Sequence, residues 1–290
     1  MKTLRNRLRR RLEWEGHPLA FEDEGEGWLR FRTSGGVPVR GAICRPEGPG
    51  PHPAVLVIHA HGNRYDIGCA ELHEGRPALD GPIGPALAAR GLLAICLDMP
   101  CFGARAGTSE SAAAKAALWQ GRSLAGQMLG ECKAALDWLS QHPDVKPGRL
   151  GVFGISMGAT LGYWLAGLDP RVCAVVHECC LADFATLISG GGHDLHGIYL
   201  TVPDLLSLAP NGVIAGLAAP RAQFVGLGDR DPLTPPDAAD VALGQLGAAY
   251  AAGGRLVIHR EPTTGHVETP AMRAAALAFL EAELLEPGPR

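Results

Sequence analysis

Several features that would place the chain in other classes of protein are absent from its sequence. No apolar run approaches the roughly 18 to 20 residues that a membrane-spanning helix needs, and none of the eight cysteines forms a C-x-x-C pair. The basic stretch of residues 1–11 is not followed by the apolar run of a secretory signal. We therefore expect a cytoplasmic chain with no membrane span, whose cysteines are reduced.

Charge is also sparse. The formal net charge is −4 and no basic stripe is present, which argues against nucleic acid as a partner. Charged residues make up 19% of the 290 residues and apolar residues 47%, so a large core can form without a long disordered segment. We predict a single domain over residues 1–290.

Short apolar runs rich in β-branched residues alternate with longer helical stretches along the chain. This alternation predicts an α/β fold with a mainly parallel sheet and helices on both faces. Eight strands are predicted, the first two antiparallel around a Gly35–Gly36 turn, at residues 28–32, 37–45, 54–59, 92–98, 150–155, 172–178, 222–227 and 255–260. Helices are predicted near residues 84–90, 112–118, 124–141, 157–167, 236–251 and 270–285.

Residues 181–219 do not follow this alternation. The segment contains no predicted strand, several glycines and the apolar stretch GIYLTVPDLLSLAP, and it is too long for an ordinary connection. We interpret it as a short lid insertion over the carboxyl ends of the strands. The alternative for its apolar stretch is a subunit interface in a homodimer.

The strongest motif is Gly154-Ile155-Ser156-Met157-Gly158, a G-x-S-x-G pentapeptide between an apolar strand and an apolar helix. A serine at such a tight strand-to-helix turn is forced into a strained backbone conformation that exposes its hydroxyl. The turn also places the hydroxyl at a helix N-terminus, where the helix dipole favours developing negative charge. Ser156 is therefore the candidate nucleophile.

A serine hydroxyl needs a base, and the base needs a carboxylate to orient it. Asp231 is the favoured acid because Gly228 and Pro235 would fix its loop on both sides, just after a predicted strand. Asp229 and Asp183 are the alternatives. His266 is the candidate base, because it lies in the loop after the last predicted strand.

An oxyanion hole needs two hydrogen-bond donors. One is predicted to be the backbone N–H of Met157, the residue after the nucleophile. The other is expected in the loop after residues 54–59, from either His61 or Asn63. The histidine pairs at 59 and 61 and at 193 and 196 lack a carboxylate or cysteine at ligand spacing, so no metal and no cofactor is predicted.

These motifs resemble those of the dienelactone hydrolase-like branch of the α/β-hydrolases, which includes acetyl xylan esterase-like members. The similar segments occur in the family's order: VIHAHG at 57–62, LDMPCFGAR at 97–105, GISMG at 154–158, GDRDPLTPP at 228–236 and GH at 265–266. The resemblance implies the α/β-hydrolase fold and matches Asp231 and His266 to the family's acid and base. Dienelactone hydrolase itself has a cysteine at the position of Ser156, so the serine favours ordinary ester hydrolysis.

The predicted activity is therefore hydrolysis of a small-molecule carboxylic ester through an acyl-enzyme. A thioesterase, an amidase or peptidase, or a perhydrolase would use the same three residues, because this fold does not fix the substrate. A ligand receptor that keeps the pocket without catalysis is the alternative from another class.

Overall fold

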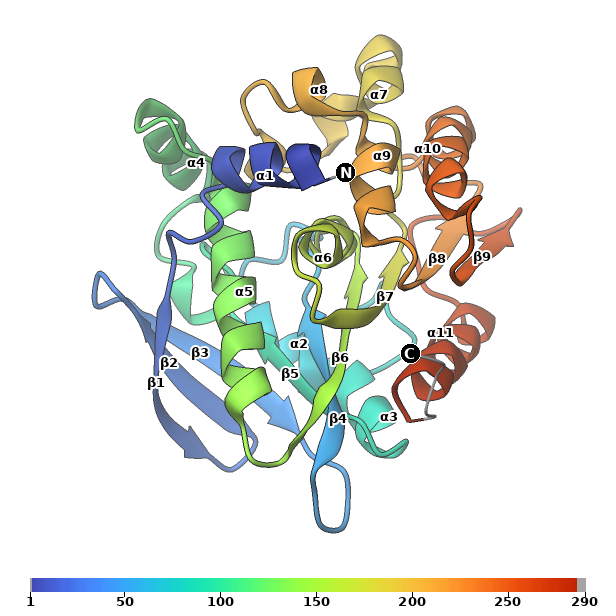
Figure 1. Ribbon diagram of the computed structural model, residues 1–290. Helices are drawn as coiled ribbons and strands as arrows, with labels where there is room; N and C mark the ends of the chain where they lie inside the picture. The colour runs from blue at the N-terminus through green and yellow to red at the C-terminus, as the bar shows by residue number, and fades with distance from the viewer. Residues whose placement is uncertain (1, 286–290) are drawn as a thin grey trace.

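The apolar runs of the sequence form the centre of a nine-stranded sheet in the computed structural model, which describes residues 2–285 (Figure 1). The strand order is β1-β2-β3-β5-β4-β6-β7-β8-β9. Six strands are parallel: β4 (His52–Ile58), β5 (Leu93–Leu97), β6 (Val145–Ile155), β7 (Val172–Glu178), β8 (Ala222–Gly228) and β9 (Leu256–Glu261). The antiparallel strands lie at one edge: β1 (Leu19–Gly25), β2 (Trp28–Thr33) and β3 (Pro38–Cys44).

The sheet has one more strand than the sequence predicts. Strand β1 escapes prediction because it is almost wholly exposed and its sequence, LAFEDEG, lacks apolar alternation. Cross-strand ion pairs hold it to β2 instead, with Arg32 bound to Glu22 and Arg30 to Asp23. The predicted mainly parallel sheet is otherwise confirmed.

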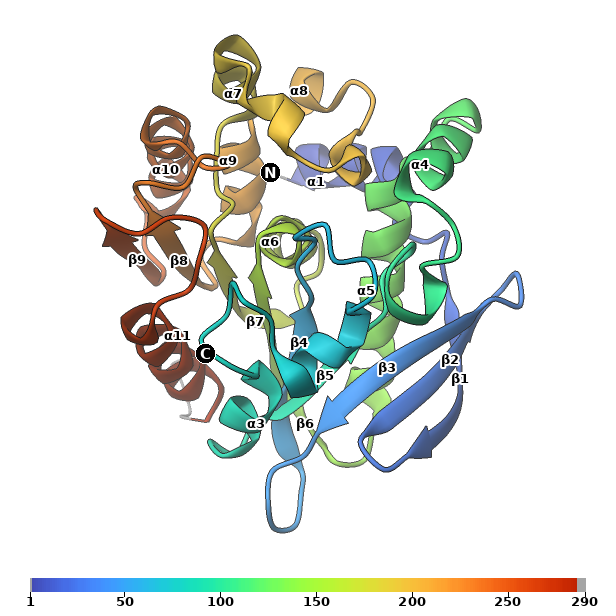
Figure 2. The same ribbon diagram turned by 180° about the vertical axis from the view of Figure 1, so that it is seen from behind.

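The two faces of the sheet are covered by different helices (Figures 1 and 2). Along β4, Leu56 and Ile58 contribute to one core, whereas Val55 and Val57 contribute to the other, as the two-residue period of a strand requires. The first core is covered by α5 (Leu124–Gln141), α6 (Met157–Leu168) and α10 (Pro236–Tyr250). The second is covered by α2 (Glu71–Glu74), α3 (Ile83–Ala88) and α11 (Pro270–Leu284).

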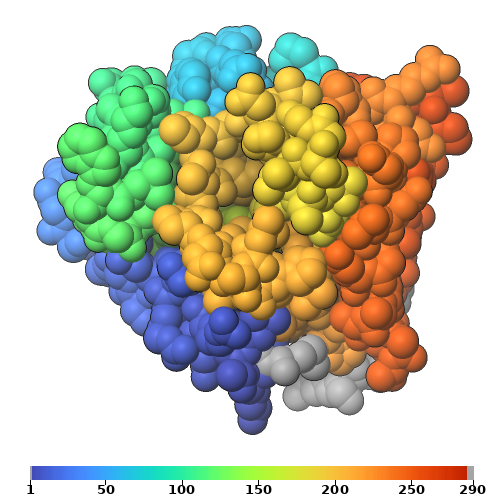
Figure 3. All heavy atoms as spheres, turned by 90° about the horizontal axis from the view of Figure 1, so that it is seen from above, coloured from blue at the N-terminus to red at the C-terminus, as the bar shows by residue number. Residues whose placement is uncertain are grey.

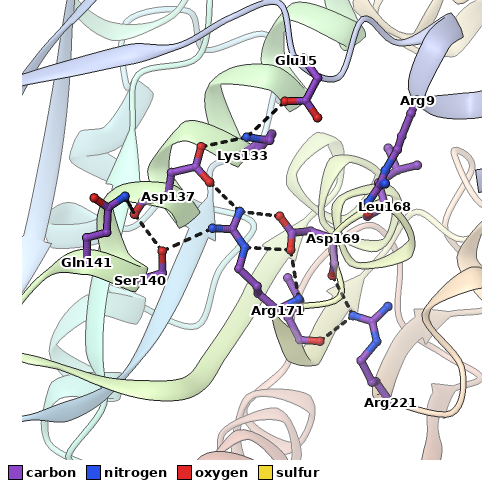
Figure 4. Close-up of polar contacts among 11 residues, drawn as sticks. Arg9, Glu15, Lys133, Asp137, Ser140, Gln141, Leu168, Asp169, Arg171 and Arg221 are labelled. Carbon is purple, nitrogen blue, oxygen red and sulfur yellow. Dashed lines mark hydrogen bonds and ion pairs between the residues drawn. The ribbon is translucent and has the colours of Figure 1, made fainter. Parts of the chain in front are cut away.

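Three arginines from distant parts of the chain bind the C-terminal end of α6. Arg5 and Arg9 of α1 (Lys2–Arg11) donate to the carbonyls of Gly167 and Leu168, and Arg221 donates to that of Ala166. Figure 4 shows Arg9 at Leu168, and Arg221 bound to the carbonyl of Asp169. These contacts satisfy carbonyls that a helix end leaves open and complement its negative dipole end. They fix the helix that begins directly after Ser156.

Residues 181–219, which the sequence predicts as a lid and which are called the lid segment below, fold into short helices: α7 (Phe184–Gly190), the 3₁₀ turns Gly192–Leu195 and Ile198–Leu200, α8 (Leu205–Leu208), α9 (Asn211–Ala215) and the turn Gly216–Ala218. Its first part, up to α8, lies above the ends of the parallel strands (Figure 1). Its last part packs into the body, where Asn211 bonds to Trp164 and Tyr163 of α6. No single helix within residues 2–285 is long and apolar enough to cross a membrane; only the bent pair Ile198–Leu208 and Asn211–Ala218 passes that test jointly.

Candidate active site

Ser156 occupies a sharp turn between β6 and α6, with φ 57° and ψ −119°. A side chain in this backbone region is strained, and such strain persists only where the surroundings enforce it. Two glycines make the turn feasible. A Cβ at Gly154 would lie 2.2 Å from the Gly158 carbonyl carbon, and a Cβ at Gly158 would lie 1.8 Å from the Ile58 carbonyl oxygen. The sequence Gly-x-Ser-x-Gly is thus required by the close approach of three chain segments.

The backbone around Ser156 leaves one donor open. The Ser156 N–H donates to the Glu178 carbonyl at 2.9 Å, which joins the turn to β7. The Met157 N–H, at the first position of α6, has no hydrogen-bond acceptor among residues 2–285. An open N–H at a helix N-terminus beside a nucleophile suits a developing oxyanion.

Asp231 and His266 form a close pair in the loops after β8 and β9. The Nδ1–H of His266 donates to Oδ2 of Asp231 at 2.7 Å. The Asp231 side chain is fully buried, and its second oxygen accepts the N–H of Leu233 at 2.8 Å. Since Nδ1 is engaged and the His266 side chain is 23% exposed, Nε2 is the nitrogen that can exchange a proton with a substrate.

The loops that carry this pair are joined by backbone contacts. The N–H of Arg230 donates to the Thr264 carbonyl at 2.9 Å, and a Cβ at Gly228 would lie 2.4 Å from that same oxygen. Because β6, β7, β8 and β9 are neighbouring parallel strands, the loops after them lie side by side along the edge of the sheet formed by the carboxyl ends of the strands. Ser156, Asp231 and His266 therefore share that edge.

The two competing aspartates have other partners. Asp229 pairs with Arg260. Asp183 caps α7 by accepting the N–H of Thr186 at 2.9 Å, and it also accepts from Gln245 at 3.2 Å. Of the three candidates from the sequence, the structure brings only Asp231 to a histidine within the described range.

Glu261, at the end of β9, organises the loop of His266. Its carboxylate accepts the hydroxyls of Thr264 at 2.7 Å and of Thr269 at 2.5 Å, one on each side of His266. It also bonds to Nε2 of His259 at 2.9 Å. Sequence reasoning missed this role, since a glutamate at a strand end is normally a solvated charge.

The loop after β4 is held by buried side chains. His59 accepts the Met99 N–H at 3.1 Å, and its Nδ1–H donates to the Ala60 carbonyl at 3.0 Å. Burial lowers the pKa of His59 to about 4, so the ring is neutral. The carboxylate of Glu71 accepts the Ala60 N–H at 3.1 Å and pairs with Arg76. His59 is thus a structural residue of this loop.

The same loop distinguishes between the two candidates for the second oxyanion donor. The N–H of Asn63 donates to Nδ1 of His61 at 3.1 Å and is therefore occupied. The backbone N–H of His61 has no acceptor among the described residues. The geometry favours His61 over Asn63 for this role.

Glu110, the first residue of α4 (Glu110–Trp119), joins this loop to the lid segment. It accepts three hydrogen bonds of 2.8 Å, from Nε2 of His61, the hydroxyl of Tyr65 and the N–H of Tyr199. Burial alone would raise the pKa of Glu110, but the hydrogen bonds from His61 and Tyr65 hold it below its ordinary value. The ring of Tyr199 stacks on His61 with centroids 5.8 Å apart. The sequence did not predict that Glu110 joins these two segments, because a glutamate directly after a helix N-cap gives no sign of such contacts.

Within residues 2–285, no three His, Cys, Asp or Glu side chains are grouped as metal ligands. The eight cysteines are all free thiols.

Comparison with known proteins places the chain in a family. The profile of the X-Pro dipeptidyl-peptidase (S15) family matches residues 35–214, more than half of the chain. The chain belongs to this family. Peptidases are hydrolases, and a relative agrees with that class. YtaP of Bacillus subtilis (strain 168), named as a hydrolase without a stated substrate, is 37% identical over 235 residues, which cover 80% of this chain and 79% of YtaP.

Solved structures confirm the α/β-hydrolase fold. Acetyl xylan esterase 1 from Thermoanaerobacterium sp. JW/SL YS485 matches with a TM-score of 0.65 at 18% identity, over 97% of this chain and 92% of the esterase. The acylaminoacyl peptidase of Pyrococcus horikoshii matches with a TM-score of 0.62 at 14% identity, over 94% of this chain and 43% of the peptidase. Esterases and peptidases share this fold, so the fold does not determine which bond is cleaved, and the residues of the site are the evidence for that question.

Proposed function

We propose that the protein is a serine carboxylic-ester hydrolase with Ser156, His266 and Asp231 as its triad. The observation that carries the proposal is the strained turn at Ser156, on the same sheet edge as the 2.7 Å pair of Asp231 and His266. A strained serine at a helix N-terminus and a carboxylate-oriented histidine are the parts that acyl transfer requires.

The reaction follows from these groups. Ser156 Oγ attacks the acyl carbon while Nε2 of His266 takes its proton, and the N–H groups of Met157 and His61 donate to the oxyanion. The C–O bond to the leaving alcohol then breaks, and His266 returns the proton to that oxygen. In the second half, His266 takes a proton from water, the hydroxide attacks the acyl-enzyme, and the acid leaves as Ser156 is reprotonated. Asp231 stays ionised and stabilises the imidazolium.

Peptide hydrolysis is the second candidate, because the matching family is one of X-Pro dipeptidyl-peptidases. Release of a dipeptide requires a carboxylate to receive the charged amino group of the substrate, since an unpaired charge is costly to bury. The two buried carboxylates beside the oxyanion loop are both engaged: Glu110 accepts three hydrogen bonds, and Glu71 accepts the Ala60 N–H and pairs with Arg76. This occupancy favours the ester over the dipeptide.

The test compares Ser156→Ala with Ser34→Ala, which alters an exposed serine in the turn before β3. Wild-type protein should hydrolyse p-nitrophenyl butyrate faster than alanyl-prolyl-p-nitroanilide. Ser156→Ala should lose activity on the order of a thousandfold or more with an unchanged melting temperature, while Ser34→Ala keeps it. A fluorophosphonate probe should label Ser156. Labelling of another serine, or faster cleavage of the anilide, would reject the proposal.

A further inference from the structure

The lid segment lines an open cavity of about 630 Å³. Seen from above the strand ends, a hollow opens among the yellow and gold residues of this segment (Figure 3). Its walls are mostly apolar and include Phe184, Leu187, Ile198, Leu200 and Leu205. Volumes of roughly 300 to 1,000 Å³ are typical of sites that hold drug-sized ligands. The cavity is therefore far larger than an acetyl group needs.

One wall of the cavity bridges the two halves of the catalytic site. Gly197 of this wall lies against the oxyanion loop, since a Cβ there would be 2.9 Å from Nε2 of His61. Its neighbour His196 donates from Nε2 to the Leu233 carbonyl at 3.1 Å, in the loop of Asp231. A group held in the cavity therefore lies beside two loops of the candidate site, the one that follows β4 and the one that carries Asp231.

The charges of the cavity exclude an anionic occupant. Among the residues that line it in the described part of the chain, none is lysine or arginine, and the carboxylates are Asp194 and Asp204. Asp204 is paired with Arg11 at 3.0 Å, and both aspartates are exposed. A ligand carboxylate or phosphate would meet these acids with no lysine or arginine in the cavity lining to pair with it, whereas the apolar side chains of the walls suit an uncharged apolar group.

We propose that this cavity binds an uncharged apolar arm of the substrate, of the size of a medium-chain acyl or aryl group. The proposal rests on the ester hydrolysis proposed above and names its substrate class. Each methylene placed in the cavity should raise kcat/KM about fourfold, which corresponds to about 0.8 kcal/mol at 25 °C. Specificity then comes from the lid and not from the triad.

The experiment measures kcat/KM for p-nitrophenyl esters from acetate to decanoate, with mono-p-nitrophenyl suberate as a chain that ends in a carboxylate. Wild-type protein should prefer octanoate to acetate by a hundredfold or more, given about fourfold per methylene. The suberate ester should be at least tenfold poorer than octanoate. Equal rates for the two would contradict the charge argument.

Two matched substitutions locate the preference. Leu200→Asp places a charge in the cavity wall, whereas Leu195→Asp alters a lid residue that is 59% exposed and does not line the cavity. Leu200→Asp should abolish the preference for octanoate, reducing the octanoate-to-acetate ratio of kcat/KM to about fourfold or less, the value of a single methylene. Leu195→Asp should retain the preference. If Leu200→Asp does not fold, Leu200→Trp should shift the optimum to shorter esters by filling the cavity.

A binding assay separates this proposal from the catalytic one. In Ser156→Ala, the neutral fluorophore N-phenyl-1-naphthylamine should bind, and Leu200→Asp but not Leu195→Asp should weaken its binding at least tenfold. Binding without hydrolysis of any ester by wild-type protein would reject the proposed function and support the cavity. Two results would overturn the cavity proposal alone. One is Ser156-dependent hydrolysis with a flat chain-length profile, and the other is equal weakening of fluorophore binding by Leu200→Asp and Leu195→Asp.

Discussion

The ring nitrogen Nε2 of His61 lies 2.8 Å from Oε2 of Glu110, so a loop that contributes to the candidate oxyanion hole is fixed by a carboxylate from α4. The same carboxylate accepts the backbone N–H of Tyr199 in the lid segment. The position of the lid and the geometry of the loop after β4 are therefore linked through one buried charge. A change at Glu110 should affect both.

The first prediction concerns this link. Glu110→Gln removes the charge and replaces one acceptor oxygen with an N–H₂ group, which cannot accept a hydrogen bond. At least one of the three donors, His61, Tyr65 and the N–H of Tyr199, then loses its acceptor. Hydrogen bonds to charged groups contribute about 1.5 to 3 kcal/mol, so kcat/KM should fall between about tenfold and a hundredfold. Glu74→Gln, on an exposed residue of α2, is the control. Steady-state kinetics on an ester decides, and equal rates for both variants would contradict the role of Glu110.

The second prediction concerns the acid. Asp231→Asn should lower kcat by up to about ten-thousandfold, because an amide cannot stabilise the imidazolium of His266 and favours the wrong tautomer. Asp229→Asn loses the pair with Arg260 and should change kcat little. Asp183→Asn removes the charge that accepts hydrogen bonds from Thr186 and Gln245, and it should lower the melting temperature more than kcat. Inactivity of Asp183→Asn together with activity of Asp231→Asn would move the acid to the loop after β7.

The third prediction concerns pH. The carboxylate oxygens of Glu178 are buried without a hydrogen-bond partner in the described structure. Burial, followed by repulsion from Glu268, raises the pKa of Glu178 well above its ordinary value of 4.5. Because the folded-state pKa is the higher one, the stabilising contribution of Glu178 is complete below pH 4.5 and is lost as the pH rises.

Glu178→Gln mimics the protonated carboxyl at every pH. The variant should equal wild type near pH 4.5 and become progressively more stable than wild type as the pH is raised. Urea unfolding midpoints at pH 5 and pH 9 measure this difference. The exposed Glu15→Gln should show none. If wild-type protein instead becomes more stable than Glu178→Gln as the pH rises, the pKa of Glu178 is not raised in the folded state and the prediction is wrong.

The fourth prediction concerns the turn at Ser156. Gly158→Ala should destabilise the protein by at least about 1 to 3 kcal/mol, as overpacking does, because its Cβ would collide with the Ile58 carbonyl. Gly244→Ala in α10 meets open space and should stabilise the protein by about 0.5 to 1 kcal/mol, the usual gain in a helix. Thermal unfolding of both variants checks the pair. Equal stability would mean that Gly158 is not required by packing.

The sequence predicts the strands, helices and turns that depend on local apolar periodicity and on the order of residues along the chain. The buried strands read as apolar runs, the helix over residues 124–141 has the predicted bounds, and the turn at Ser156 has its glycines beside it in sequence. The edge strand β1 could not be predicted, because ion pairs with β2 replace the apolar pattern. The roles of Glu110 and Glu261 also stayed hidden, since each depends on partners that only the fold brings within reach.

The arginine contacts at the end of α6 also bear on the order of folding. Arg5 donates to carbonyls that follow it by 162 and 212 positions, those of Gly167 and Leu217. A helix of 10 residues is marginal by itself, as isolated helices shorter than about 12 to 15 residues are. During synthesis, α1 leaves the ribosome before its acceptors on α6 and at Leu217 have been made. The helix α1 therefore docks late, after the helix that follows Ser156 has formed.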